Sequence, residues 1–284
     1  MTISVIIPTA RDSAAVGALL ESLRAQIVDA PYEVILVNDL PAMERSDPDF
    51  CTVLRGEGKG PACARNLGAA HAKGKFLLFL DDDVKIDESY IARILREIDA
   101  RPGQAVSGMQ RAIERNNSFS LAAEWMLHLF VDESCHRFAP SNALAMRRAD
   151  FERCGGFDPF FPLAGGEDRE FSIRWIACGF KIACVESACV EHRFPRTFGS
   201  LAKQQWRYGR GAFQLRHRVP ERGLGVRYYY RMLTEAPLRY GFLMGLRVSM
   251  LCFVSQAILA SGYLRERIRP AAQPLATPEE ACAE

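Results

Sequence analysis

Three consecutive carboxylates, Asp81, Asp82 and Asp83, directly follow the apolar segment Lys75–Leu80 (KFLLFL). Like charges at this spacing repel one another, and a fold tolerates them most readily when a cation neutralises the cluster. Asp81 and Asp83 can supply oxygen ligands to one hard divalent ion, while water and a phosphate complete its coordination. A solvent-exposed turn without an ion is the alternative interpretation. The residue types therefore predict a divalent metal site at the end of a strand.

A second acidic pair, Glu167 and Asp168, follows two glycines and opens a predicted helix over Glu167–Gly179. Acidic side chains in a first helical turn are ordinary partners of the helix dipole. A carboxylate at a junction between loop and helix can also face a cleft and act as a general base. The pair is therefore a candidate for proton transfer, with a dipole partner as the alternative.

His192, at the end of a predicted strand, would add an imidazole to the metal site only if that strand end faces the aspartates.

A strongly basic segment lies between Arg193 and Arg231, with ten Arg and Lys residues against the single acid Glu221. The whole chain carries a formal charge of +2, so the remainder is acidic, at −7. This asymmetry indicates an anionic partner such as phosphate, pyrophosphate, a lipid surface or nucleic acid. A solvated basic face is the alternative.

Inside the basic segment, Gln204 and Arg207 lie about one helical turn apart and can both donate to phosphate oxygens. The neighbouring rings of Trp206 and Tyr208 could stack on a sugar face. An amphipathic helix that rests on the protein or on lipid explains the same residues. The basic arginines occupy one short segment without a recognised nucleic-acid module, so we expect no nucleic acid partner.

The elements that must position these residues alternate between strand and helix. The predicted strands and helices of the first hundred residues are, in chain order, Ile3–Pro8, Ser13–Gln26 (helix), Glu33–Asn38, Val53–Leu54, Pro61–Ala72 (helix), Lys75–Leu80 and Glu88–Ala100 (helix). This alternation predicts right-handed βαβ units and a mainly parallel sheet. Ligands of such sheets bind beyond the carboxyl ends of the strands. The Thr9–Arg11 turn, Asp39 and the Asp81–Asp83 cluster all fall there.

The rest of the chain is less regular. Its predicted elements are a helix over Phe119–Val131, a short strand and loop over Ala139–Met146, the Glu167–Gly179 helix, a strand over Lys181–Glu191, and helices around 198–217 and 224–239. We expect an α/β domain over 1–197, a basic and aromatic helical region over 198–264, and a disordered tail over 265–284. The stretch Val248–Leu264 is 17 residues long and has no charge, so it is at the lower limit for spanning a bilayer, and Arg247 lies at its entrance.

Composition excludes wholesale disorder, because 49% of the residues are apolar and 25% are charged. Nine scattered cysteines without CxxC pairs indicate neither a disulfide framework nor a zinc ribbon. The first apolar run is stopped by Pro8 and lacks the basic start of a signal peptide. These features predict a protein of the reducing cytoplasm.

The order of eight sequence blocks resembles the family 2 glycosyltransferases, a large inverting family with the GT-A fold. The blocks are ISVIIPTAR, EVILVND, GPACARNLG, FLLFLDDDV, NALAMRR, CGGFDPFF, GEDREFSIRWIACG and VEH, which together cover about residues 1–195. The resemblance implies a Rossmann-like, nucleotide-binding α/β fold and an enzyme that uses a nucleotide-diphosphate sugar. It also implies a divalent cofactor, Mn²⁺ or Mg²⁺.

By the same resemblance, Asp39 would contact the nucleotide base and Asp168 would be the catalytic base, held or tuned by Glu167. The implied metal ligands are Asp83, Asp81 and His192. The implied donor-binding residues are Thr9, Arg11, Asp39, Arg65, Asp81, Asp82, Gln204 and Arg207. Asn142, Trp206 and Tyr208 would lie on the acceptor side.

Gln204–Arg207 resembles the QxxRW element of polysaccharide synthases, with Tyr208 in place of its Trp. Asn38-Asp39-Leu40-Pro41 lacks the second acid and the Ser that usually follow this strand, and Ala10-Arg11 replaces an aromatic and an Asn that relatives often carry. The base identity therefore stays open among uracil, guanine and thymine.

Together these features predict a metal-dependent, inverting glycosyltransferase with a glycan or lipid-linked acceptor. We expect it on an anionic membrane surface, peripheral or monotopic at the inner face of the cell membrane, and a homo-oligomer is left open. A nucleotidyltransferase on a similar scaffold is the first alternative, although its basic glycine-rich signature after the first strand is represented only by Arg11. A non-catalytic protein of the membrane surface is the second, and it leaves the two carboxylate clusters unexplained.

Overall fold

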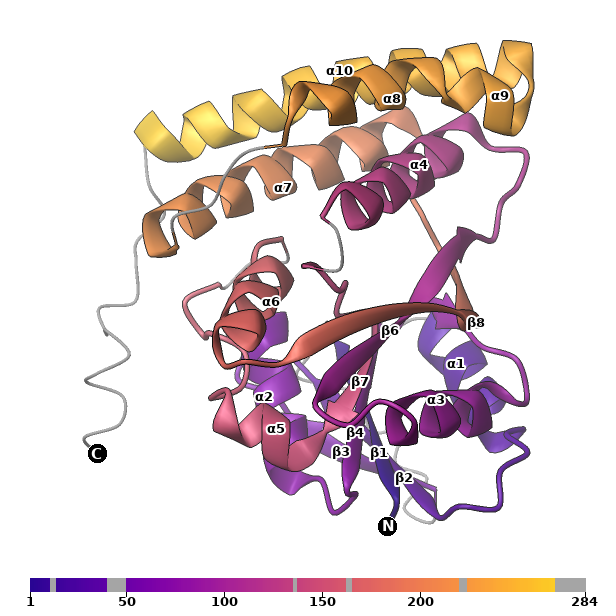
Figure 1. The fold of residues 1–284 in the computed structure, drawn as a ribbon, viewed down its shortest axis with the longest axis vertical. Helices are drawn as coiled ribbons and strands as arrows, with labels where there is room; N and C mark the ends of the chain where they lie inside the picture. Colours follow the sequence, from indigo (N-terminus) through magenta and orange to yellow (C-terminus); the bar gives the residue numbers. More distant parts are fainter. Residues whose placement is uncertain (11–13, 40–49, 135–136, 162–164, 220–223, 269–284) are drawn as a thin grey trace.

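The computed structural model describes residues 1–10, 14–39, 50–134, 137–161, 165–219 and 224–268. Figure 1 shows a sheet with helices on both faces in the lower half of the view and a further layer of helices above it. The strands are β1 (Ile3–Thr9), β2 (Tyr32–Asn38), β3 (Cys51–Arg55), β4 (Phe76–Leu80), β5 (Val84–Lys85), β6 (Gln104–Ala112), β7 (Ala143–Arg147) and β8 (Lys181–His192). The helices are α1 (Ala14–Arg24), α2 (Pro61–His71), α3 (Tyr90–Asp99), α4 (Ser118–Glu133), α5 (Arg148–Arg153), α6 (Glu167–Ala177), α7 (Phe198–Arg218), α8 (Val226–Thr234), α9 (Ala236–Tyr240) and α10 (Phe242–Ile268).

The central strand β1 is buried on both faces, as its unbroken apolar sequence predicts. Because successive side chains point to opposite faces of a sheet, β1 contributes to two cores. Ile3, Val5 and Ile7 pack into the core that contains residues of α1 and α3. Ile6 packs into the core that contains residues of α2, α5 and α6. The predicted α/β class with flanking helices is confirmed.

The sheet is mixed, in the order β3-β2-β1-β4-β7-β6-β8-β5. The four strands at one side, β3, β2, β1 and β4, are parallel, as expected. Strand β7 runs antiparallel to both of its neighbours, and β5 runs antiparallel to β8. Strands β6 and β8 are again parallel to each other, so the predicted mainly parallel sheet is interrupted by the antiparallel β7 and β5. Strand β6 (QAVSGMQRA) was not predicted from the sequence, because Ser107, Gly108 and Gln110 interrupt its apolar side chains.

The helices that follow residue 197 do not form a separate unit. Leu201 of α7, Tyr228 of α8 and Cys252 of α10 share one core with Trp125 of α4, which lies inside the predicted first domain. Figure 1 shows α4, α7, α8, α9 and α10 together above the sheet. The predicted helix 224–239 is divided into α8 and α9, with Pro237 in the first turn of α9. A proline there lacks the N–H that would continue the preceding helix.

Helix α10 continues to Ile268, so the predicted tail over 265–284 is wrong for its first residues. Glu266 is 1% exposed and accepts hydrogen bonds from Arg210 Nε at 2.6 Å and from Gln214 Nε2 at 3.1 Å, both on α7. A buried ion pair thus joins the end of α10 to α7. The remainder of the predicted tail, 269–284, lies outside the described residues.

Within the described ranges, α10 is the one helix that is long and apolar enough to cross a membrane by length and composition. Its most apolar window has a mean hydropathy of 1.8, and 28% of that window is buried in the protein. A core helix of a soluble protein can have the same length and composition, but it would be mostly buried.

Candidate active site

A cavity of about 860 Å³ lies between the carboxyl ends of the central strands and the helices above the sheet. Thr9 at the end of β1, Asp39 after β2 and the Asp81–Asp83 cluster after β4 all line it. This is the edge at which parallel strands present ligands. The opposite wall comes from α4, α7, α8 and α10, so the cavity is closed by both halves of the molecule.

Asp81, Asp83 and His192 form a group with metal-ligand chemistry. One oxygen or nitrogen atom of each lies within 4.8 Å of the others, and His192 Nε2 lies 3.2 Å from Asp83 Oδ1. Both side chains of this contact are largely buried, at 12% and 15% exposure. Two carboxylates and an imidazole suit Mn²⁺ or Mg²⁺. The short strand β5 brings His192 to this place because Val84 pairs with it in the sheet.

Arg65 of α2 links this cluster to the Glu-Asp pair. Its Nη2 donates to Asp81 Oδ1 at 2.7 Å, and its Nη1 donates to Glu167 Oε1 at 3.3 Å. The side chain is 3% exposed, and its guanidinium also lies 5.5 Å from the centre of the Phe157 ring. Burial by itself lowers the pKa of Arg65, but Asp81 and Glu167 outweigh that effect, and its pKa is raised. Expected as a donor-binding residue, Arg65 is engaged with two carboxylates of the protein.

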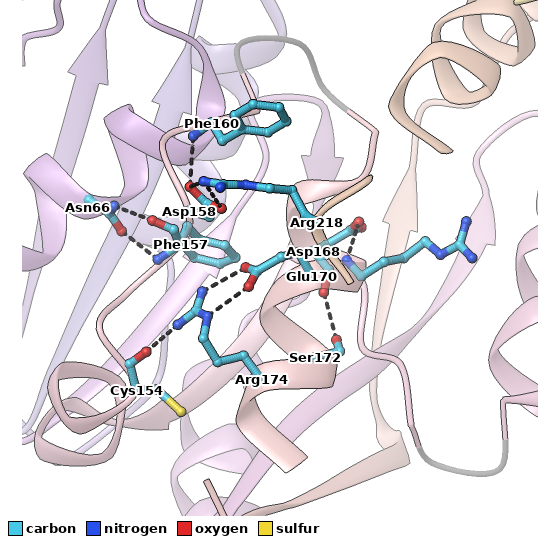
Figure 2. A network of polar contacts seen from close by, with 11 residues as sticks. Asn66, Cys154, Phe157, Asp158, Phe160, Asp168, Glu170, Ser172, Arg174 and Arg218 are labelled. Carbon is cyan, nitrogen blue, oxygen red and sulfur yellow. Dashed lines mark hydrogen bonds and ion pairs between the residues drawn. The ribbon is translucent and has the colours of Figure 1, made fainter. Parts of the chain in front are cut away.

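Asp168, which lines the cavity, has a strongly shifted pKa. Burial and the adjacent charge of Glu167 raise the pKa of Asp168 to about 7, although Arg65 and Arg169 act in the opposite direction. Its Oδ1 accepts a hydrogen bond from Arg169 N at 2.9 Å, and its carbonyl oxygen accepts one from Ser172 Oγ at 2.7 Å (Figure 2). A carboxyl group with this pKa can take up and release a proton near neutral pH.

Glycines set the position of the first turn of α6. Gly165 and Gly166 have φ values of 119° and 132°, which side chains strongly disfavour. On α7, a Cβ atom at Gly211 would lie 1.4 Å from the carbonyl oxygen of Gly165. The backbone before Asp168 can therefore pack directly on α7 only because these positions carry no side chain.

Polar contacts brace the loop before α6 from two sides (Figure 2). Asn66 of α2 donates through Nδ2 to Phe157 O at 2.7 Å and accepts from Phe157 N at 2.9 Å. Arg218 of α7 lies 3.0 Å from Asp158. This loop thus ties α2, which carries Arg65, to the far end of α7.

Two further predicted residues, Thr9 at the end of β1 and Asp39 after β2, also line the cavity. Thr9 Oγ1 donates to the buried carboxylate of Asp82 at 2.6 Å, so Asp82 is turned toward β1. Asp39 Oδ1 accepts a hydrogen bond from Gly58 N at 3.2 Å. Arg11, the other predicted residue of this turn, lies outside the described residues.

Helix α7 brings four of the five residues of the QxxRW-like element, Gln204–Tyr208, to the cavity. Gln204, Arg207 and Tyr208 line it, together with the buried Gln205. Among the described residues the Nε atom of Arg207 is buried without a hydrogen-bond partner. Trp206 is not among the lining residues, and its backbone packs on Gly262 of α10. The structure therefore separates Trp206 from the other residues of the element.

Asn142, expected on the acceptor side, is paired with a residue that the sequence analysis did not single out. Asn142 Nδ2 donates to Gln110 Oε1 at 2.8 Å, and Gln110 Nε2 donates back at 2.6 Å. Both side chains are buried and line the cavity. No signal identified Gln110, because the strand that carries it was not predicted.

A comparison with protein families matches residues 4–157 to the family described as Glycosyl transferase family 2. Residues 135–196 match a second description, N-terminal domain of galactosyltransferase. Together the two matches span the strands of the sheet. The second match contains both the Glu167–Asp168 pair and His192.

Two curated relatives illustrate the range of similar proteins. A putative polypeptide N-acetylgalactosaminyltransferase 13 of Drosophila melanogaster is 29% identical over 166 residues, which are 51% of this chain and 30% of the relative. A pre-mycofactocin glycosyltransferase of Mycobacterium tuberculosis is 26% identical over 238 residues, 78% of this chain and 48% of the relative. The chain thus spans less than half the length of these relatives.

Among solved structures, a mannosyltransferase from Pyrobaculum calidifontis in complex with GDP-Man and Mn²⁺ has the same fold. The two structures have a TM-score of 0.60 at 20% identity, over 94% of this chain and 81% of the other. The fold therefore extends beyond the residues that match the family and includes the upper helices.

Proposed function

The chain belongs to glycosyl transferase family 2, and on this premise we propose that it is a metal-dependent, inverting enzyme. It moves a sugar from a nucleotide-diphosphate donor to a hydroxyl group of a glycan or lipid-linked acceptor. One observation carries the proposal: the Asp81, Asp83 and His192 group and the carboxyl group of Asp168 line the same cavity. Glycosyl transfer needs a metal site that contacts the donor and a base that contacts the acceptor hydroxyl, and both must lie within one cavity.

The metal would be held by Asp81, Asp83 and His192, whose oxygen and nitrogen atoms fit a Mn²⁺ or Mg²⁺ ion. When bound, such an ion offsets the negative charge that develops on the leaving diphosphate. The solved mannosyltransferase that shares the fold contains GDP-Man and Mn²⁺, which supports this assignment.

Arg207 supplies positive charge from the opposite wall. Its guanidinium lines the cavity, and the Nε atom has no hydrogen-bond partner among the described residues. A buried, unsatisfied donor costs free energy unless a ligand accepts its hydrogen bond. A diphosphate oxygen is a suitable acceptor, and the interaction strengthens as negative charge accumulates on the leaving group.

Asp168 acts as the base in the transfer. Its carboxylate accepts the proton of the acceptor hydroxyl while that oxygen attacks the anomeric carbon from the side opposite to the diphosphate. One displacement of this kind inverts the configuration. Because its pKa is raised to about 7, Asp168 is a stronger base than an ordinary aspartate and is still largely ionised just above neutral pH. Glu167 remains bound to Arg65 and tunes the basicity of Asp168 through its charge.

The acceptor is presented at a membrane. On α10 the exposed apolar side chains follow one helical stripe, formed by Leu243, Leu246, Met250, Phe253 and Leu264. A helix with such a stripe can lie in the headgroup region of a bilayer, while arginines meet anionic lipid. Arg247 and Arg265 are exposed on the same helix and supply that charge.

The decisive experiment is a panel of nucleotide sugars tested for thermal stabilisation of the full chain with and without Mn²⁺ or Mg²⁺. We expect one donor to stabilise the protein only in the presence of the metal, and this result identifies base and sugar together. Stabilisation by nucleoside triphosphates alone would favour the nucleotidyltransferase. If no nucleotide stabilises the protein under any condition, the catalytic proposal is wrong.

A further inference from the structure

The cavity continues beyond the polar groups into an apolar part, which we call the apolar chamber. Its walls include Met126, Leu127 and Phe130 of α4, Tyr229 of α8 and Leu259 of α10. Pockets for a single small ligand have volumes of about 300–1,000 Å³, so a cavity of about 860 Å³ is at the large end of that range. The donor chemistry described above accounts only for its polar end.

Two contacts connect the apolar chamber to the reacting groups. Arg169, the residue after Asp168, places its guanidinium 4.8 Å from the centre of the Phe130 ring. The His192 ring lies 4.5 Å from the ring of Phe194, which also lines the cavity. Apolar side chains therefore lie beside Arg169, the neighbour of Asp168, and beside His192 of the candidate metal site. An acceptor whose hydroxyl reaches Asp168 must place its next atoms against these side chains.

The walls of the chamber also leave apolar surface uncovered. Tyr229 lines the cavity and is 42% exposed, whereas its neighbour Tyr228 is 3% exposed and donates through its hydroxyl to Met126 O at 3.5 Å. Tyr228 thus fixes α8 on α4, whereas Tyr229 lines the cavity and stays partly exposed. An exposed aromatic wall next to a polar catalytic end suits an amphiphilic ligand.

We propose that the apolar chamber binds a hydrocarbon portion of the acceptor, so that the acceptor is a hydroxylated head group on an apolar stem. The inference rests on the proposed glycosyl transfer and specifies its acceptor. The hydroxyl lies at Asp168, and the hydrocarbon extends between α4, α8 and α10. A purely polar oligosaccharide would leave the walls formed by Leu127, Phe130 and Leu259 in contact with water.

The test uses n-hexyl, n-octyl and n-decyl β-D-glucoside as probes, each below its critical micelle concentration, with calorimetric titration of the full chain. Burial of each methylene strengthens binding by about fourfold. We expect affinity to rise with chain length. Two adjacent tyrosines provide a matched pair of variants, because Tyr229 lines the cavity and Tyr230 is 66% exposed and does not. Tyr229→Ser should weaken binding of the decyl probe by about tenfold, and Tyr230→Ser should leave it within about twofold of the parent.

Two results would overturn the proposal. Affinity that does not change with chain length would show that no apolar site takes the stem. Equal weakening by Tyr229→Ser and Tyr230→Ser would place the probe on the outer apolar surface of α8 instead. Leu127→Gln on α4 is a further variant, expected to weaken binding like Tyr229→Ser, and a thermal melt of each variant identifies misfolding.

The same samples separate this inference from the proposed function. Binding of GDP, UDP and dTDP with Mn²⁺ is measured beside the glucoside titrations. If the nucleotides bind and the alkyl chain has no effect, the apolar chamber is refuted and the proposed function stands. If no nucleotide binds, the proposed function fails whatever the alkyl probes do. Nucleotide and decyl glucoside should also bind together, because they occupy different ends of the cavity, and mutual exclusion would contradict that placement.

Discussion

Arg65 Nη1 lies 3.3 Å from Glu167 Oε1, although the two residues are 102 positions apart in the sequence. This ion pair gives two adjacent carboxyl groups different roles. Glu167 has a buried positive partner in Arg65. Burial and the charge of Glu167 raise the pKa of the neighbouring Asp168 to about 7, whereas Arg65 acts in the opposite direction. The pKa of Asp168 therefore depends on a balance between its burial and the charges of Glu167 and Arg65.

Replacement of Asp83 should separate metal binding from folding. We expect Asp83→Ala to weaken Mn²⁺-dependent nucleotide binding by more than about tenfold, because one of the two carboxylates of the metal-type group is lost. Relief of repulsion within the aspartate cluster should leave the thermal midpoint of the free protein equal or higher. Calorimetric titration of nucleotide with and without Mn²⁺ measures the effect. Asp99→Ala, an exposed carboxylate on α3, is the control, and unchanged affinity in Asp83→Ala would remove Asp83 from the site.

Asp168→Asn should keep donor binding and reduce turnover by about 10²–10⁴-fold, because the amide has nearly the same shape but cannot accept the proton. A variant that transfers sugar within a few-fold of the parent rate would exclude Asp168 as the base, and Glu167→Gln would be examined next.

The pH dependence of kcat/KM should report the raised pKa of Asp168. Below pH about 7 the group is protonated and cannot act as a base, so activity should rise about tenfold per pH unit and level off above pH 7. Initial rates at a fixed metal concentration between pH 5 and 9 measure this profile. A rate that is already maximal at pH 5 would mean that the base has an ordinary carboxyl pKa.

Arg65→Gln should shift the same profile to higher pH. The positive charge of Arg65 lowers the pKa of Asp168, so its removal should raise that pKa further. The variant should also lose about 3–5 kcal/mol of stability, because it leaves two carboxylates without their buried partner. Arg96→Gln, exposed on α3, is the matched control. An unchanged pH midpoint in a folded Arg65→Gln protein would contradict the electrostatic role.

Two glycines on α7 offer a test of the packing that positions Asp168. A Cβ atom at Gly211 would collide with the backbone of Gly165, whereas a Cβ atom at Gly199 would meet nothing within 4 Å. We expect Gly211→Ala to lose most activity and about 1–3 kcal/mol of stability, because the first turn of α6 must move. Gly199→Ala should match the parent in thermal melts and activity assays. Equal behaviour of the two variants would show that the contact does not position the base.

Membrane binding should depend on the apolar stripe of α10. Met250 and Phe253 are 63% and 64% exposed, and we expect Met250→Ser with Phe253→Ser to reduce flotation with anionic liposomes several-fold. Ile27→Ser changes an equally exposed apolar residue that lies after α1, and it should have no effect. High salt should weaken binding of the parent, since each basic group near the surface contributes about 1 kcal/mol and is screened. Failure of the parent to float with any liposome would defeat the membrane proposal and favour a packed helix or a dimer.

Much of the sheet could be predicted from the sequence because its central strands are continuous apolar runs of strand length. Ile3–Pro8 and Lys75–Leu80 were predicted within one residue of β1 and β4. The shared position of Thr9, Asp39 and the Asp81–Asp83 cluster follows from chain direction alone, since parallel strands end at one edge of the sheet. Strand β6 was not predicted, because its apolar side chains follow no regular pattern. Strand β7 lies largely within the predicted strand and loop over Ala139–Met146, but its antiparallel direction was not predicted, because pairing direction depends on distant segments.

The candidate site, too, could be predicted only in part from the sequence. The sequence by itself determined the residue types that could bind a metal or accept a proton, namely the Asp81–Asp83 cluster and the Glu167–Asp168 pair. Only the tertiary structure decided which of them act on one another. His192 reaches Asp83 because β5 pairs with β8, and Arg65 reaches Glu167 because α2 and α6 cover the same face of the sheet. The backbone of Trp206 packs on Gly262 of α10, and Trp206 is not among the residues that line the cavity. Contacts of this range depend on how whole elements pack, and local spacing in a sequence carries no information about that packing.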